Sequence, residues 1–144
     1  MRTILFRGKT KEGKWYKGLP TRRSPLDTEV NRIQLLDDYL ENDSMVFFMV
    51  REVLPETVGQ YTGLTDKNGK RIFEGDICRF REWSKGDMCW IGKVHYEHQQ
   101  FVISGDKNKE CESPFTLVMS RFISENIEVI GNIYDNPELL KGGA

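Results

Sequence analysis

Long apolar runs are missing from this sequence. The longest consecutive apolar stretch covers residues 45–50, far short of the roughly twenty residues that a membrane-spanning helix needs. The N-terminus, MRTILFRGKTK, has neither the extended apolar core nor the small-residue cleavage site of an export signal. These absences predict a soluble, cytoplasmic protein without a membrane segment.

Cysteine and histidine are scarce. Cys78, Cys89 and Cys111 form an odd set without paired spacing, which indicates reduced thiols and not a disulfide framework. Together with His95 and His98 they contain no CxxC pair or other zinc-ligand spacing. The glycines form neither a phosphate-binding loop nor a dinucleotide fingerprint. We therefore expect no metal and no cofactor.

Motifs for catalysis are also absent. No nucleophile elbow occurs, and no local motif joins a serine or cysteine to a histidine and an acid. Glu74 and Asp76 flank Gly75 at the start of an expected strand, which is compatible with acid–base or metal chemistry. Asp76 is also suited to accept backbone N–H bonds within the bend. We favour the second interpretation, predict no catalytic residues, and keep a metal-dependent hydrolase as the weaker alternative.

Neither sign of charge dominates, but the charges are unevenly distributed along the sequence. The net charge is only -1, yet residues 1–23 contain eight Lys or Arg against one Glu. Residues 27–43 contain six acidic residues against one Arg. Such asymmetry fits either a nucleic-acid footprint at the basic end or neighbouring strands with complementary charges. The isoelectric point near 6.2 favours the second interpretation, because nucleic-acid-binding domains are usually much more basic.

Short alternating runs bounded by turn residues dominate what is present. They predict an all-β protein, a barrel or a sandwich. The expected strands are 3–7, 14–19, 45–53, 58–61, 70–73, 77–82, 88–96, 101–104 and 127–134. Asn136 as N-cap and Pro137 at the first helical position predict a short C-terminal helix.

Two segments of the N-terminal part are harder to assign. Pro20 and Pro25 predict a loop over 20–25, because proline lacks the N–H that a central ladder needs. Residues 30–40 have apolar side chains at helical spacing. The shorter run 32–36 equally fits a strand that turns into 45–53. Helix and hairpin both remain open on this pattern alone.

Turn chemistry is richest in residues 55–80, PETVGQYTGLTDKNGKRIFEGDICRF. The sequence DKNG predicts a tight turn with Gly69 in left-handed backbone, and Gly75 a sharp bend before the next strand. Gly59 and Gly63 are likewise expected at bends. Most of this stretch is therefore explained by backbone geometry and not by chemistry.

The motifs ILFRGK, GKWYKG, PETVGQYTGLTDKNGKRIFEGDI and IEVIGNIYDNPELL together resemble the YopX family of phage and prophage proteins. The resemblance implies an SH3-like barrel, with an N-terminal β extension and a short C-terminal helix. It also favours the hairpin over the helix at 30–44. We expect an extension over 1–54 and a barrel region over 55–144. The family implies a bacterial host but no established biochemical role.

Aromatic residues next to basic ones are the candidate partner-binding residues. Lys14 and Tyr16 lie in the first expected hairpin, and Arg81 and Trp83 at the end of the 77–82 strand. Such pairs can stack on bases and neutralise phosphates, although they also fit core aromatics flanked by solvated charges. We predict a non-catalytic binding or assembly module for a protein partner or a second copy of itself. Nucleic-acid binding through the basic N-terminal region with Arg81 and Trp83 is the alternative.

Overall fold

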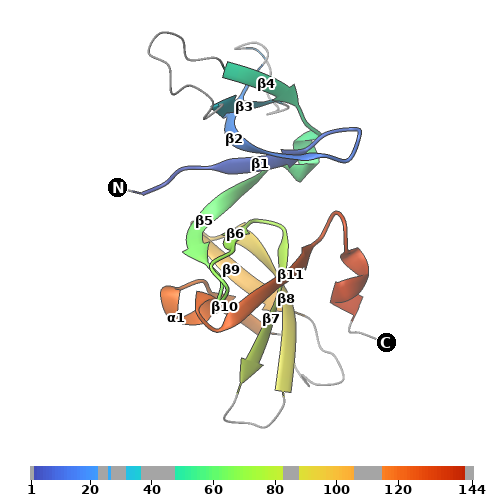
Figure 1. Ribbon diagram of the computed structural model, residues 1–144. Coiled ribbons are helices and arrows are strands. Elements are labelled where there is room, and N and C mark those ends of the chain that lie inside the picture. The colour runs from blue at the N-terminus through green and yellow to red at the C-terminus, as the bar shows by residue number, and fades with distance from the viewer. Residues whose placement is uncertain are drawn as a thin grey trace. The chain divides into compact units, whose positions relative to one another are not determined.

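The computed structural model describes residues 2–22, 26, 32–36, 48–82, 88–105 and 115–141. Strands dominate these residues, so the all-β prediction is confirmed (Figure 1). The chain divides into two compact units, Met1–Tyr61 and Thr62–Ala144. A division at 54/55 and the SH3-like form of the barrel remain predictions.

The first unit is an antiparallel sheet with the strand order β4-β3-β2-β1-β5. Its buried apolar residues include Ile33 and Val53, which are 0% and 3% exposed. The turn between the first two strands contains Gly13 at φ +86°, as predicted. The elements are β1 (Phe6–Lys9), β2 (Trp15–Thr21), β3 (Arg32–Leu36), β4 (Phe48–Glu52), the 3-10 helix η1 (Pro55–Thr57) and the start of β5 (Gly59–Thr65).

Within the ambiguous segment, the described residues 32–36 form a strand and not a helix. β3 pairs antiparallel with β4, from Arg32 opposite Glu52 to Leu36 opposite Phe48. The helical spacing was misleading because Ile33, which is 0% exposed, lies in a strand that pairs with β2 on one side and with β4 on the other. The hairpin interpretation is confirmed for these strands, and the connection between them lies outside the described residues.

The position of Pro20 contradicts part of the predicted loop over 20–25. It lies inside β2, opposite Ile33 of β3. β1 pairs with β2 only as far as Gly18, so at Pro20 the strand has left its β1 neighbour and one side of the backbone needs no ladder donor. The loop expectation was wrong at Pro20 and Thr21, which both lie in β2, and residues 23–25 lie outside the described residues.

The second unit contains a five-stranded antiparallel sheet in the order β10-β9-β8-β7-β11 (Figure 1). Its core gathers apolar side chains from β6 to β11, including Ile72, Cys78, Val94, Ile103 and Ile127. The short β10 and α1 were not predicted. The elements after β5 are β6 (Arg71–Phe73), β7 (Asp76–Glu82), β8 (Met88–Glu97), β9 (Gln100–Gly105), β10 (Phe115–Val118), α1 (Arg121–Ser124), β11 (Ile127–Asn132) and the 3-10 helix η2 (Pro137–Lys141).

The predicted β5–β6 turn is present and is anchored by a buried carboxylate. Asp66 Oδ1 accepts hydrogen bonds from the backbone N–H groups of Asn68 and Lys70, both at 2.9 Å. Its Oδ2 accepts the N–H of Val129 in β11 at 3.0 Å. Gly69 has the expected positive φ, +80°. One side chain therefore shapes the turn and ties it to a strand 63 residues away.

The predicted bend before β7 is also confirmed. Gly75 has φ +85°, and Asp76 Oδ2 accepts the backbone N–H of Phe73 at 2.8 Å. Gly63 has positive φ as well, +86°. Gly59 does not mark a bend, because it lies in β5 opposite Arg7 of β1. That expectation was wrong, because Gly59 is a buried residue of a paired strand.

The two-residue turn between β8 and β9 gives a first prediction. His98 and Gln99 have φ +48° and +63° between the paired residues Glu97 and Gln100, the backbone of a type I′ turn that Asn-Gly suits best. The double variant His98→Asn/Gln99→Gly should therefore raise the free energy of unfolding by about 1 kcal/mol. Urea denaturation measures this, with Gln99→Ala as a control that should give no gain. An unchanged or lower stability in the double variant would contradict the prediction.

Candidate functional site

A groove in the first unit brings together two of the four predicted partner-binding residues, Lys14 and Tyr16. Its volume is about 560 Å³, within the range of pockets that hold small ligands or a few side chains. The β1–β2 turn forms one wall, and β4 with the segment after it forms the other. The lining residues are Thr10, Lys11, Glu12, Lys14, Tyr16, Val50, Arg51, Glu52, Val53, Leu54 and Pro55.

The two walls are fastened to each other at Lys9. The N–H of Leu54 donates to the Lys9 carbonyl at 2.8 Å. The Thr57 hydroxyl accepts the Lys9 N–H at 2.8 Å and donates to the Leu54 carbonyl at 2.7 Å. Thr57 itself is buried, and its partly buried hydrogen bonds tie the segment after β4 to the end of β1.

The β1–β2 turn is stiffened in a similar way by Thr10. Its N–H donates to the Lys14 carbonyl at 2.9 Å, and its hydroxyl accepts the Lys14 N–H at 3.2 Å. These bonds fix the backbone at Lys14. A side chain on a fixed backbone loses less conformational freedom on binding, which favours affinity.

Arg51 and Tyr16 meet within the groove. The Arg51 guanidinium carbon lies 5.3 Å from the centroid of the Tyr16 ring, a cation–π contact. Arg51 Nε is buried without a hydrogen-bond partner. The sequence analysis did not single out Arg51, because β4 lies far from β2 in the sequence and no local motif marks their contact.

The charges of the groove are mixed, with a cationic excess. Lys11, Lys14 and Arg51 oppose Glu12 and Glu52. A hydrogen bond from its own backbone N–H, followed by one from Thr10, lowers the pKa of Glu12, so this carboxylate remains ionised and engaged within the turn. A ligand would therefore meet cations beside an apolar wall of Val50, Val53 and Pro55.

Comparison with protein families shows to which family the chain belongs. The YopX protein family model matches residues 5–141. The chain belongs to the YopX family. Its fold is similar to the crystal structure of protein EF1440 from Enterococcus faecalis, with a TM-score of 0.59 and 24% sequence identity over 97% of this chain and 99% of that chain. No curated protein matches the chain.

Of the other two predicted residues of this YopX chain, the structure describes the backbone of Arg81 alone. Arg81 lies in β7 of the second unit, opposite Cys89 of β8. Trp83 lies outside the described residues. Of the four candidates, the structure therefore assembles Lys14 and Tyr16 into one site.

An array of polar side chains on the second unit was also not predicted. His95 Nε2 lies 2.8 Å from Glu97 Oε2, and Ser104 Oγ lies 3.5 Å from His95 Nδ1. The sequence does not reveal this array, because Ser104 belongs to β9 whereas His95 and Glu97 belong to the neighbouring strand β8. The His95 hydrogen bond lowers the pKa of Glu97, a carboxylate in open solvent. The long Ser104 contact, at the limit of a hydrogen bond, gives the hydroxyl little activation in this geometry.

Asp76, the candidate for metal chemistry, is only 1% exposed and accepts the Phe73 N–H. In the part of the chain that the structure describes, no group of three or more His, Cys, Asp or Glu side chains is placed to hold a metal ion. Within the same residues, no helix is long and apolar enough to cross a membrane.

Proposed function

We propose that this YopX-family chain is a non-catalytic binding module that holds a segment of a partner protein in the groove of its first unit. One observation carries the proposal: Lys14 and Tyr16 line the same groove as Arg51, whose guanidinium covers the Tyr16 ring. The setting we propose is a phage or prophage protein acting in the cytoplasm of its bacterial host.

The chemistry of the groove defines the partner segment. The cations Lys11, Lys14 and Arg51 favour a carboxylate. The aliphatic wall and the Tyr16 ring favour an apolar side chain beside it. A short acidic segment with one or two apolar residues fits both requirements. Because partly buried hydrogen bonds at Thr57 join the two walls of the groove, we expect it to need little rearrangement to bind.

Capture experiments with matched variants test this function. Lys14→Glu reverses a charge in the groove, and Lys17→Glu reverses a nearby charge in β2 that does not line the groove. Tagged wild type and both variants would be used to capture proteins from host cells that carry the phage or prophage, with quantitative mass spectrometry of what is retained. We expect a partner that Lys14→Glu loses at least tenfold and Lys17→Glu retains.

Identical capture by the two variants would overturn the groove as the binding site. Thermal unfolding of each variant separates lost binding from lost folding. Tyr16→Phe provides a second comparison, since it keeps the ring under Arg51 and should retain the partner, whereas Tyr16→Leu should weaken capture.

Nucleic-acid binding is the second candidate, and one contact favours it. The Arg7 guanidinium lies 4.9 Å from the centroid of the Trp15 ring, within the basic N-terminal segment 1–23, and paired cations and aromatics suit single strands. Mobility-shift assays with single-stranded and duplex DNA at several salt concentrations test it. Absence of a shift at low salt would exclude this candidate, because phosphate contacts are strongest there.

A further inference from the structure

Proline at position 20 determines how the backbone groups of the first sheet are directed. Pro20 lies in β2 opposite Ile33 of β3. Opposite residues of an antiparallel ladder alternate between pairs that exchange two N–H···O=C bonds and pairs that exchange none. Proline has no N–H to donate, so Pro20 and Ile33 form a pair of the second kind. The backbone groups of Ile33 therefore point away from β2, toward its other neighbour, β4.

The same alternation continues into β4. Ile33 lies opposite Arg51, so this pair is of the hydrogen-bonded kind and Arg51 directs its N–H and C=O groups to β3. Val50 and Glu52 precede and follow Arg51 in the strand. Their backbone groups therefore point to the other edge of β4, away from β3.

That edge of β4 opens into the groove. Among the described strands, β4 ends its sheet, with β3 as its neighbour (Figure 1). Successive side chains of a strand point to opposite faces, yet Val50, Arg51 and Glu52 all line the groove. The groove therefore touches both faces of β4 and the edge between them. Two residues after Glu52, the Leu54 N–H likewise points away from β3, because it donates to the Lys9 carbonyl of β1 at 2.8 Å.

The side chains along this edge define what an added strand must present. Residues directly opposite each other in adjacent strands have their side chains on the same face. Opposite Arg51, whose guanidinium carbon lies 5.3 Å from the centroid of the Tyr16 ring, an acidic side chain is favoured. The next residues of the added strand lie on the other face of β4. There Val50, which is 42% exposed, favours an apolar side chain, and Glu52 disfavours an acid.

Building on the function proposed for the groove, we propose that the partner segment binds as an additional strand on the open edge of β4. It lies antiparallel to β4, with an acidic residue opposite Arg51 and an apolar residue on each side of it. Backbone bonds to Val50 and Glu52 supply affinity and the alternating side chains supply specificity, as in peptide binding by strand addition. A second copy of β4 paired about Arg51 would place two cations opposite each other, which disfavours that occupant.

Peptides with methylated backbone nitrogens test strand addition. The probe is an acetylated and amidated peptide of alternating valine and glutamate, with binding measured by isothermal titration calorimetry. N-methylation of the valines removes the N–H groups that face Val50 and Glu52, whereas N-methylation of the glutamates removes those that face away. We expect the first change to weaken binding at least about tenfold and the second less than about threefold, because the first alone removes hydrogen bonds to β4.

A substitution in β4 probes the same bonds from the protein. Val50→Pro removes an N–H at the open edge, where proline is tolerated because the pairing with β3 does not use it. Val50→Ala shortens the side chain and keeps the N–H. We expect Val50→Pro to weaken binding of the unmethylated peptide at least about tenfold and Val50→Ala to weaken it less, with circular dichroism showing both variants folded. If Val50→Pro unfolds the chain, the methylated peptides decide.

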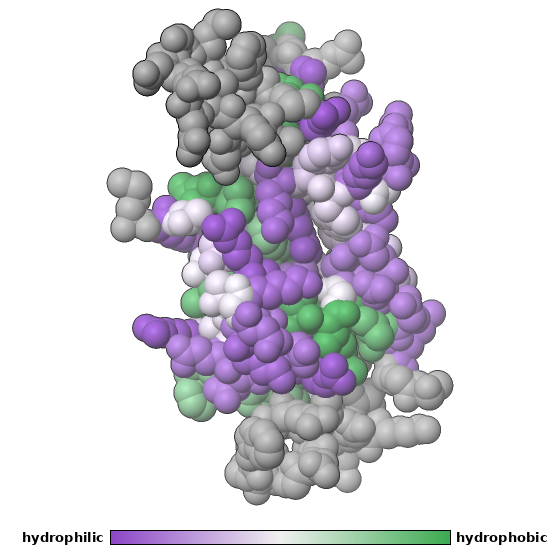
Figure 2. Space-filling model, in the orientation of Figure 1, coloured by the Kyte–Doolittle hydropathy of each residue, from purple (hydrophilic) through white to green (hydrophobic). Residues whose placement is uncertain are grey.

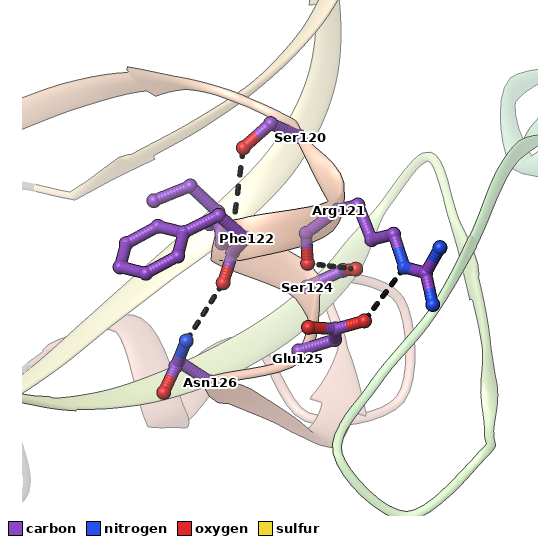
Figure 3. Close-up of polar contacts among 7 residues, drawn as sticks. Ser120, Arg121, Phe122, Ser124, Glu125 and Asn126 are labelled. Atoms are coloured by element: carbon purple, nitrogen blue, oxygen red, sulfur yellow. Dashed lines mark hydrogen bonds and ion pairs between the residues drawn. The ribbon is translucent and has the colours of Figure 1, made fainter.

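Two variants in the second unit control for non-specific attraction of the probe. Arg121 pairs with Glu125 at 2.7 Å in the α1 turn, and Phe122, which is 72% exposed, points away from that turn (Figure 3). Figure 2 shows other apolar residues at the described surface. Arg121→Glu and Phe122→Ser should leave peptide binding unchanged. Loss of binding in either would overturn the edge of β4 as the site of this probe.

Strand addition and the groove function fail in different ways. Equal effects of the two methylations on a peptide whose binding needs Lys14 would overturn strand addition and leave the groove function standing. The reverse methylation pattern would overturn the antiparallel arrangement. No binding of the unmethylated peptide at about 1 mM, or a wild-type dimer that Val50→Pro dissociates, would overturn the acidic and apolar strand as occupant. The groove function itself fails if Lys14→Glu and Lys17→Glu capture the same partners.

Discussion

Replacing Asp66 with alanine should lower the free energy of unfolding of the second unit by about 3–4 kcal/mol, because a buried donor left without a partner costs roughly 1–3 kcal/mol. Three backbone N–H groups, from Asn68, Lys70 and Val129, depend on this one carboxylate. Asp66 is only 5% exposed and its bond to Val129 is buried, so water cannot readily replace that bond, whereas the bonds to Asn68 and Lys70 are partly buried. Chemical denaturation followed by circular dichroism gives the change directly.

Asp135→Ala is the matched control for that experiment. Asp135 is exposed, and its carboxylate accepts a bond from the Asn132 side chain at 3.1 Å. Its loss should cost less than about 0.5 kcal/mol, as is usual at the surface. Equal costs for the two substitutions would show that the buried carboxylate does not hold the turn. Asp66→Asn should fall between them, because its amide keeps one acceptor oxygen.

Gly105→Ala should be the most damaging single methyl addition in the second unit, with a loss of about 2–3 kcal/mol from overpacking. A Cβ at Gly105 would overlap the backbone carbonyl oxygen of Ile91 and lie 2.5 Å from Phe115 Cε1. A backbone atom inside a sheet cannot move aside without breaking its ladder. Thermal and urea unfolding of the variant measure the loss.

Gly8→Ala provides the comparison. There the added Cβ would meet only the Val53 side chain, with the nearest carbon at 2.7 Å. Val53→Ala should therefore recover part of the stability that Gly8→Ala loses, which a double-mutant cycle detects. The second substitution Phe115→Leu should not restore Gly105→Ala to a comparable extent, because the Ile91 carbonyl remains. Full recovery would place the obstruction in the Phe115 ring instead.

The turns and bends of this fold could be predicted from short stretches of the sequence. The turn at Asp66 and Gly69, the bend at Gly75 and Asp76, and the hairpin around Gly13 could be predicted because a few neighbouring residues determine the backbone. The family resemblance was needed to choose between helix and strand for residues 30–44. Periodicity alone does not distinguish these two structures in a short apolar run.

The features that were missed depend on contacts between distant segments. Pro20 is compatible with β2 only because the β1 pairing has already ended. Gly59 lies in a paired strand and not in a turn. Of the eleven residues that line the groove, the sequence analysis singled out Lys14 and Tyr16. Arg51 could not be predicted, because its position beside Tyr16 depends on the register of three strands.

The bond between Asp66 and Val129 also bears on how the chain is made. Because the two residues lie 63 positions apart, the β5–β6 turn leaves the ribosome long before the strand that completes its hydrogen bonds. β7 is in the same situation, since it pairs with both β8 and β11. During synthesis, the second unit therefore carries an incomplete sheet with open strand edges. Its final fold is reached only when β11 emerges, so premature termination before Ile127 should yield an aggregation-prone fragment and not a smaller stable domain.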